Sequence, residues 1–269
     1  DDIRAASLND VQEFFSLYYH PANASLVIAG DVNTDEAIAV ATDHFAPLAP
    51  GTLSGPVTAS LDRMSGTQYL RLNDRVELPR LYLSWPSTAL FGDHDAELDL
   101  AADILASGKS SRLYRALLHD REIATDVSVH QASSELSGIF SIVVTAAPGH
   151  TLSDINIVVA DEIHRMQSDG VTEEEFTRAR NRMEADFAWQ CQSVGGFGGV
   201  SDQLNAYNVF AKTPGFFETD WNRYKYATPG SICEAITMLL TPETEVALSI
   251  VPQKTADAAL PESDLLEMR

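Results

Sequence analysis

Two short strings in this chain place a histidine three residues before a glutamate, HDAEL at 94–98 and HDREI at 119–123. Imidazole and carboxylate groups bind zinc, but a catalytic zinc site needs three protein ligands and an open position for water. Each string offers two ligands at most, so we expect neither to hold zinc. We expect His94 to lie at a solvated helix start, where Asp93 and Asp95 suit the positive end of the helix dipole.

The string GKSSRLYR at 108–115 contains the GKS of a phosphate-binding loop. That loop needs another glycine five residues before the GK and a strand leading into it. Here the earlier position is Asp103 and the preceding residues are predicted to be helical. We therefore interpret the glycine of GKS as a helix break, with Leu113 and Leu117 packing inward and Arg112 pairing with a carboxylate.

The glycine-rich string GGFGG at 195–199 follows a predicted helix and lacks the GxGxxG spacing of a dinucleotide loop. Its glycines predict a close approach between helices or a hinge, with the Phe197 side chain as a plug. A role for this segment in lining a peptide chamber is the alternative. Cys191 and Cys233 form no CxxC pair, so they predict small core residues, with a disulfide as the alternative. No serine lies in a GxSxG elbow. The scattered histidines predict surface or core positions: His20, His44, His130, His150 and His164.

The composition indicates a globular chain with an acidic surface. Of its 269 residues 45% are hydrophobic, and 18 basic against 39 acidic residues give a net charge of −21. A negative field of this size repels phosphate backbones and anionic lipids, so we expect neither nucleic acid nor a membrane as partner. The apolar runs are far shorter than the roughly 20 residues that cross a bilayer.

A helix, a proline turn and an apolar strand occur twice, at 7–31 and at 227–252. Superposing Pro21 on Pro242 brings Val11 onto Ile232, and a slip of one residue aligns the two strands. Self-similarity at so long an interval indicates duplicated domains. We predict the tail of a preceding domain at 1–46, a linker rich in Pro, Gly and Ser at 47–57, and a second domain at 58–269.

The periodicity predicts an α+β fold for the second domain, a two-layer sandwich with helices on one face of a largely antiparallel sheet. A helix–strand–helix tail precedes it, with helices starting at Ser7 and Thr34 and a strand at 24–30. Later helices are predicted from Ser153 and from a capping box of Thr172 and Glu175. The strands of the second domain are predicted at 68–73, 80–86, 125–134 and 138–146, the last two as a hairpin, with a final strand in the second repeat.

Three segments resemble the pitrilysin and insulinase-type zinc peptidases. FFSLYYHPANASLVIAGDVNTDEA is similar to the end of their first domain, and LAADILASGKSSRLYRALLHDREIATDVSV is similar to the central motif of their second, inactive domain. SDGVTEEEFTRARNRMEADF extends the likeness over almost the whole chain. The resemblance implies a metalloenzyme (LuxS/peptidase-like) type of fold. It also implies a zinc ion bound through HxxEH in the first domain, upstream of Asp1, and no cofactor in this chain.

The family carries an Arg and a Tyr, seven residues apart, in the half that faces the zinc, where they bind the scissile carbonyl. Leu118 and Thr125 occupy those positions here and cannot do so. The resemblance therefore places the chain in the half that bears the zinc motif, the N-terminal half of a long bacterial member. We expect no catalytic, cofactor-binding or metal-binding residue in the chain itself.

The resemblance implies a non-catalytic segment that shapes the substrate chamber of a zinc endopeptidase. Its partners would be the upstream zinc-bearing domain, the other half or a homologous subunit, and an unfolded peptide. Two alternatives stay open, a structural subunit like the core proteins of a respiratory complex and an inactive partner of a separate zinc-bearing subunit. Export to the periplasm is also implied. The opening DDIRAAS shows no targeting peptide, so we expect the signal outside this chain.

Overall fold

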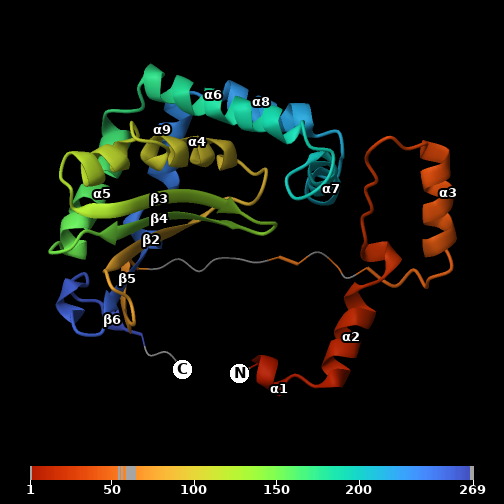
Figure 1. Cartoon of the computed structure of the whole chain (residues 1–269), viewed down its shortest axis with the longest axis horizontal. Helices are drawn as coiled ribbons and strands as arrows, with labels where there is room; N and C mark the ends of the chain where they lie inside the picture. The colour runs from red at the N-terminus through yellow and green to blue at the C-terminus, as the bar shows by residue number, and fades with distance from the viewer. Residues whose placement is uncertain (1, 54, 56, 59–64, 267–269) are drawn as a thin grey trace. The chain divides into compact units, whose positions relative to one another are not determined.

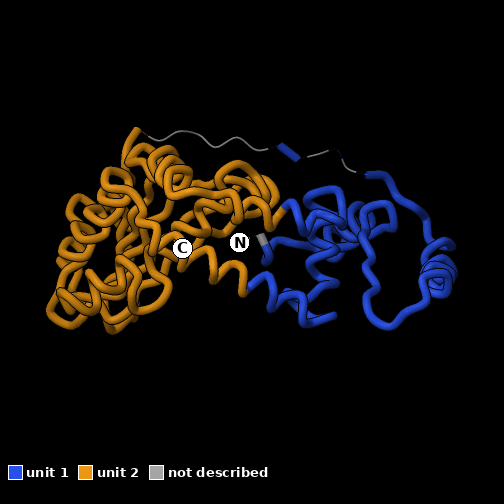
Figure 2. Tube along the Cα trace, turned by 90° about the horizontal axis from the view of Figure 1, so that it is seen from above, with its two compact units in different colours: residues 1–58, 186–219 blue, residues 59–185, 220–269 orange. Residues whose placement is uncertain are grey.

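The computed structural model describes residues 2–53, 55, 57, 58 and 65–266, and the chain divides into two compact units (Figure 2). Unit 1 consists of residues 1–58 and 186–219, and unit 2 consists of residues 59–185 and 220–269. Residues 186–219 thus group with the N-terminal segment, whereas the predicted second domain is continuous. The domain boundaries stay a prediction, and the linker prediction at 47–57 includes positions 54 and 56, which lie outside the described residues.

Unit 2 contains a six-stranded sheet in the order β3-β4-β2-β5-β1-β6. β1 pairs in parallel with β5 and with β6, and the other neighbours are antiparallel, which confirms the largely antiparallel sheet. The strands are β1 (Gln68–Asp74), β2 (Arg80–Ser87), β3 (Ala124–Ser133), β4 (Gly138–Ala146), β5 (Val246–Pro252) and β6 (Asp264–Leu265).

Helices lie on one side of this sheet, as Figure 1 shows. They are α4 (Asp95–Ala106), the π-helix η2 (Tyr114–His119), α5 (Leu152–Ser168), α6 (Glu173–Gln190), α8 (Phe217–Tyr226) and α9 (Pro229–Leu239). The last residues of α6 and the first of α8 belong to unit 1. In the part of the chain that the structure describes, no helix is long and apolar enough to cross a membrane.

The core of unit 2 lies between the sheet and these helices. Because side chains alternate across a strand, one face of each strand carries the buried residues. On β2 these are Leu81, Leu83 and Trp85, and they oppose Val144, Ile142 and Phe140 of β4. Leu113 and Leu117 are also fully buried, and Gly108 before them has a φ of 79°, which confirms the predicted helix break and inward packing.

Unit 1 contains α1 (Asp2–Ala5), α2 (Leu8–Tyr18), the 3₁₀ turn η1 (Pro21–Asn23), α3 (Thr34–Phe45) and α7 (Val200–Phe210). The strand predicted at 24–30 has a free edge, because no described strand forms a ladder with it, and it is therefore not part of the sheet. Its sequence has the required alternation, but a strand also needs a hydrogen-bonded neighbour.

Side-chain caps account for most of the helix starts. Ser7 caps α2 with Asp10, as predicted, and Thr151 caps α5 with Asp154. The predicted start of α5 at Ser153 is therefore too late, because Thr151 is the residue whose hydroxyl accepts the free amide of the first turn. α8 was not predicted at all. Its sequence FETDWNRYKY is polar on average and has no capping box, and it directly follows the predicted PGFF turn.

An ion pair connects the turn before η2 to the start of α6. Arg112 donates from Nε and Nη2 to the two carboxylate oxygens of Glu175, at 2.7 Å each, and from Nη2 to Gly170 O at 2.7 Å. Glu175 also accepts from the backbone and hydroxyl of Thr172 in the predicted capping box. The predicted pairing of Arg112 with a carboxylate is confirmed. Burial raises the pKa of Glu175, but the bonds from Arg112 and Thr172 outweigh it and lower the pKa to about 2.

Replacing Glu175 by glutamine should destabilise unit 2 by about 2–3 kcal/mol at pH 7, because Arg112 keeps its charge and loses its counterion in a partly buried site. The folded pKa of Glu175 is below the unfolded one, so its stabilisation is complete above about pH 4.5 and is lost as the pH falls toward 2. Urea unfolding at several pH values measures both effects. Glu174→Gln, an exposed neighbour of equal charge, is the control and should change stability little. Equal stability of the two variants would contradict the assignment.

Candidate functional site

The residues first considered for zinc do not form a metal site. His94 precedes α4 in the left-handed region with a φ of 65°, and its side chain caps no backbone group. His119 is exposed and lies 2.8 Å from Asp120. Among the residues that the structure describes, no group of three His, Cys, Asp or Glu side chains is placed to hold a metal ion. The side chains present therefore do not fit a catalytic zinc.

Leu118 and Thr125 also offer nothing to a scissile carbonyl. Leu118 lies partly buried in η2 and has no donor group. Thr125 is exposed near the start of β3, and its hydroxyl donates to Thr145 O at 3.4 Å. A carbonyl at these positions would meet an aliphatic side chain and a hydroxyl already turned toward the backbone.

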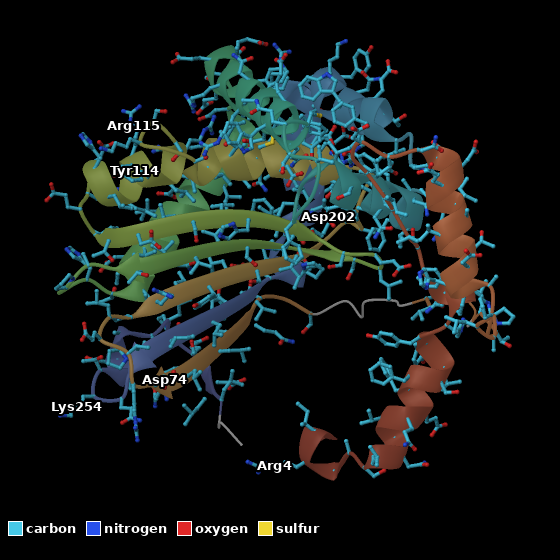
Figure 3. The ribbon with its side chains drawn as sticks, turned by 45° about the vertical axis from the view of Figure 1, so that its right-hand side comes forward. Arg4, Asp74, Tyr114, Arg115, Asp202 and Lys254 are labelled. Carbon is cyan, nitrogen blue, oxygen red and sulfur yellow. The ribbon has the colours of Figure 1, made fainter. Side chains whose placement is uncertain are left out.

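The glycine-rich loop of unit 1 turns outward. Gly196 and Gly198 both have φ near 80°, and the Phe197 ring between them is fully exposed, so the predicted plug is wrong. Gly198 N donates to Asp202 (Figure 3) of α7 at 2.9 Å, which holds the loop to that helix. The two cysteines are free, Cys191 exposed and Cys233 partly buried. Of the five scattered histidines, His20 is partly buried, and the other four are exposed: His44, His130, His150 and His164.

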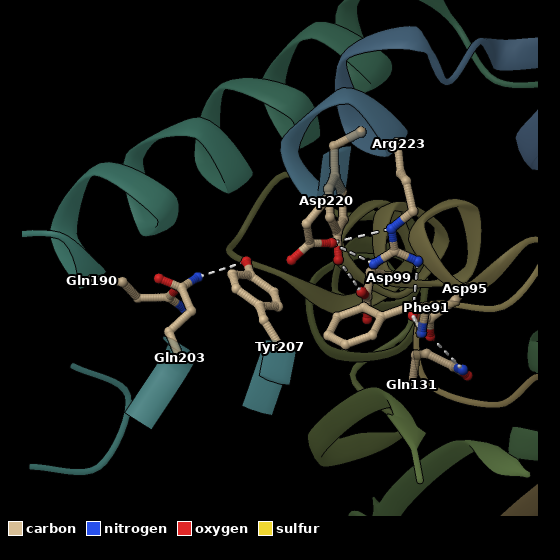
Figure 4. A network of polar contacts seen from close by, with 10 residues as sticks. Phe91, Asp95, Asp99, Gln131, Gln190, Gln203, Tyr207, Asp220 and Arg223 are labelled. Atoms are coloured by element: carbon tan, nitrogen blue, oxygen red, sulfur yellow. Dashed lines mark hydrogen bonds and ion pairs between the residues drawn. The ribbon is translucent and has the colours of Figure 1, made fainter. Parts of the chain in front are cut away.

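The start of α4 contains a buried carboxylate rather than the solvated residues that the sequence predicted. Asp95 is buried, and one of its oxygens accepts from Phe91 N and from Arg223 Nη1, both at 3.0 Å (Figure 4). Its other oxygen accepts from Gln131 Nε2 at 3.4 Å. The prediction of a solvated helix start is wrong for Asp95. The reason is that a guanidinium from α8, far along the chain, compensates the buried charge.

Several acidic side chains surround the guanidinium of Arg223. It donates from Nη2 to Asp220 at 2.6 Å in addition to its bond with Asp95. The hydroxyl of the neighbouring Tyr224 donates to Asp99 on α4 at 2.6 Å. Burial, with the nearby charge of Asp95 as a smaller cause, raises the pKa of Asp99 to about 7 despite the bond from Tyr224. No sequence motif predicts this network, because its members come from α4, β3 and α8, and α8 was not predicted from the sequence.

A groove of about 370 Å³ follows β3, which is an edge strand of the sheet. Five consecutive residues of β3, 127–131, line one side of the groove, and Asp99 and Asp103 of α4 line the other. Arg182 lies 3.4 Å from Asp103 and partly neutralises it. The carboxyl groups of Asp99 and Asp103 in the lining of the groove suit a cationic or hydrogen-bonding group.

No described helix of unit 2 lies over the opposite face of the sheet (Figure 1). This face carries apolar side chains. The registers of β1, β2, β4 and β5 align these partly exposed side chains across four strands: Leu70, Leu72, Tyr82, Ile139, Val143, Leu248 and Ile250. At one end of this open sheet face, a hollow of about 490 Å³ is lined by Tyr82 and Ile250 and by three charged residues, Glu77, Arg80 and Asp74. Asp74 is labelled in Figure 3. An uncovered apolar face with acidic residues at its border can bind neutral or basic apolar chains.

Comparison with known families gives one match that covers most of the chain. The model of the family described as Peptidase M16 inactive domain matches residues 5–183. This match confirms the resemblance found in the sequence.

Two curated relatives show similar identity and coverage. Zinc protease PqqE of Helicobacter pylori is 23% identical over 203 residues, which are 74% of this chain and 46% of the relative. An uncharacterised zinc protease of Mycobacterium leprae is 24% identical over 227 residues, 84% of this chain and 48% of the relative. The chain thus spans about half the length of the curated relatives it matches.

Solved structures share the fold. A protease from Helicobacter pylori superposes with a TM-score of 0.82 at 19% identity, over 94% of this chain and 61% of that one. The periplasmic protease PqqL from Escherichia coli superposes with a TM-score of 0.61 at 15% identity, over 83% of this chain and 24% of that one. At these identities the likeness concerns the fold alone.

The Asp99 carboxyl should make the stability of unit 2 depend on pH near neutrality. Its pKa is higher in the folded state than the ordinary 3.8, so its contribution is complete below about pH 3.8 and is lost as the pH rises toward 7. Asp99→Asn keeps an acceptor for Tyr224 and removes the titration. We expect the variant to be at least as stable as the native chain at pH 8 and to show a flatter dependence between pH 4 and 8.

Chemical unfolding followed by circular dichroism over this pH range measures the effect. Asp93→Asn, at an exposed position in the turn before α4, is the control and should keep the native pH dependence. If the native chain and Asp99→Asn showed the same slope, the carboxyl would be ionised throughout and the geometry of the network would have to be revised.

Proposed function

Because the chain belongs to the Peptidase M16 inactive domain family, we propose that it forms a non-catalytic wall of a peptide-binding chamber in a longer zinc endopeptidase. Its own side chains would bind and orient an unfolded peptide and leave bond cleavage to another domain. Holding a flexible substrate in place lowers the entropic part of the barrier without contact with the scissile bond.

The open sheet face supports this proposal most directly. Sheets in soluble proteins normally bury their apolar face, and contiguous apolar surface that stays uncovered commonly marks a binding site. The face presents Tyr82, Leu248 and Ile250 beside one another in adjacent strands. Their side chains lie on one face of a hydrogen-bonded ladder, which suits an extended peptide of varied sequence.

The charge of the chain favours neutral or basic peptides. The net charge of −21 attracts cations over long range, and Asp74 and Glu77 stand at the border of the hollow on the open sheet face. Long-range attraction of this kind mainly raises the association rate and weakens with salt.

The partners that this role requires are a zinc-bearing domain of the same family, encoded before Asp1, and either the other half of the peptidase or a homologous subunit. The zinc ion would be bound by that domain, since the residues described here do not fit it. We also propose a periplasmic location, because the structural neighbour PqqL from Escherichia coli is a periplasmic protease. Cell fractionation of the producing organism tests the location directly.

Replacing Ile139, which is 54% exposed on the open sheet face, by serine should weaken the binding of an unfolded peptide about five- to tenfold. Fluorescence anisotropy of a labelled, unstructured basic peptide measures the dissociation constant. Ile157→Ser is a matched control, because Ile157 is 61% exposed on α5, on the helical side of the sheet. This control should bind as tightly as the native chain.

Equal weakening by the two variants would mean that the peptide does not bind on the open sheet face. Absence of binding by the native chain at micromolar concentrations would contradict the chamber role and favour the alternative, a structural subunit with the same fold.

A further inference from the structure

A further cavity lies on the helical side of the sheet in unit 2, away from the open sheet face. It has a volume of about 170 Å³. Leu83 and Trp85 of β2 line it from the sheet, and α5 lines it from the helical layer. The turn between α9 and β5, which contains the 3₁₀ helix η3 (Pro242–Thr244), forms the third wall. Since a protein cavity of about 150 Å³ can hold benzene, this space suits one ring or one branched apolar group.

The wall that α5 contributes is a single stripe of the helix. Its members are Asn156, Ala160, Ile163, His164 and Gln167. Residues three and four positions apart lie on the same face of a helix, so these side chains stand above one another. Ile163 is buried, Asn156 and Gln167 are partly buried, and Ala160 and His164 are exposed. The cavity is therefore apolar at its floor and polar where it opens to solvent, as ligand pockets commonly are.

The floor of the cavity contains a polar group that lacks a hydrogen bond. Trp85 is only 3% exposed, and among the described residues its buried Nε1–H group has no hydrogen-bond partner. Buried indole N–H groups usually find an acceptor, because an unpaired donor away from water is unfavourable. An acceptor that enters the cavity would supply the missing bond.

The carboxyl group of Glu245 lines the same cavity beside Trp85. Ser84 pairs with Val246 in the antiparallel ladder of β2 and β5, so Trp85 and Glu245 are the next residues along the two segments. One oxygen of Glu245 accepts from Thr67 Oγ1 at 3.0 Å. Burial raises the pKa of Glu245, although the bond from Thr67 lowers it. No lysine or arginine is among the described residues that line the cavity, so an acceptor group stands here without a cation.

We propose that this cavity binds an uncharged amide that carries an aromatic or branched apolar group. The apolar group would lie against Leu83 and Trp85, the amide oxygen would accept from Trp85 Nε1, and the amide N–H would donate to Glu245. An anion would meet Glu245 without a compensating cation, and an amine would leave the Trp85 donor unpaired. The same chemistry is present in a free aromatic amide and in an apolar residue of a peptide. The proposal does not depend on peptide binding by the open sheet face.

Titration of the ¹⁵N-labelled 269-residue chain with benzamide tests the proposal through the indole N–H signal of Trp85. The chain has three tryptophans, and Trp85→Phe identifies the Trp85 signal by its loss. We expect this signal to shift in a saturable manner with a dissociation constant on the order of 1 mM, while those of Trp189 and Trp221 stay in place. Benzoate, an anion of the same shape, should cause no shift.

A capped residue, N-acetylphenylalaninamide, distinguishes the two sources of the amide. Tighter binding of the capped residue than of benzamide supports a peptide residue as the occupant, and weaker binding supports a free small amide. The absence of a saturable Trp85 shift with both compounds, or equal binding of benzoate, would overturn the proposal.

Three variants locate the site, with the broadening of the benzamide ring-proton signals as the readout. Ala160→Phe fills the cavity from its exposed rim and should abolish binding. Ala185→Phe, the same change at an exposed position of α6, is the control and should bind as the native chain does. Trp85→Phe keeps a ring but removes the donor, so it should weaken binding about fivefold. Native affinity in Ala160→Phe would show that benzamide binds elsewhere and would contradict the proposal.

Discussion

A helix and the strand that follows it must both be covered on their apolar sides, and this constraint organises the whole chain. α9 and β5 satisfy it, because α4, α5, β1 and β2 enclose them. α2 and residues 24–30 have the same sequence plan and no such enclosure among the described residues. Hydrophobic burial is the main driving force of folding, so the exposed apolar side chains of α2 are unfavourable in water. The same reasoning supports the proposal that a peptide binds to the open sheet face of unit 2.

Inside unit 2, buried or partly buried carboxylates are stabilised by ion pairs with arginine side chains. Two arginines, Arg112 and Arg223, each bind one carboxylate from a distant part of the chain, Glu175 and Asp95, and so connect segments that are far apart in the sequence. Near Arg223, burial is the main cause that raises the pKa of Asp99 to about 7, and the charge of Asp95 adds a smaller increase. Such a network is suited to positioning helices, and nothing in it resembles a metal centre or a nucleophile with its base. The buried polar groups of this network connect α4, β3 and α8.

Much of the fold could be predicted because its signals are local. The alternation in GIFSIVVTA specified β4 to the residue, and the Thr172 and Glu175 pair gave the start of α6. What could not be predicted depends on contacts between distant residues. Asp95 looked like a solvated helix start because Arg223 lies 128 positions later, on a helix with no start signal. Residues 24–30 failed to form a strand because a ladder needs a neighbour, and Phe197 is exposed because two left-handed glycines turn its loop outward.

The central claim is that catalysis belongs to another domain, and zinc content measures this most directly. Native mass spectrometry of the 269-residue chain, after incubation with zinc and dialysis, counts tightly bound ions. The account predicts no stoichiometric zinc and no cleavage of an unfolded peptide by the same preparation. One zinc per chain that survives dialysis, or a peptide cut by the purified chain, would contradict it.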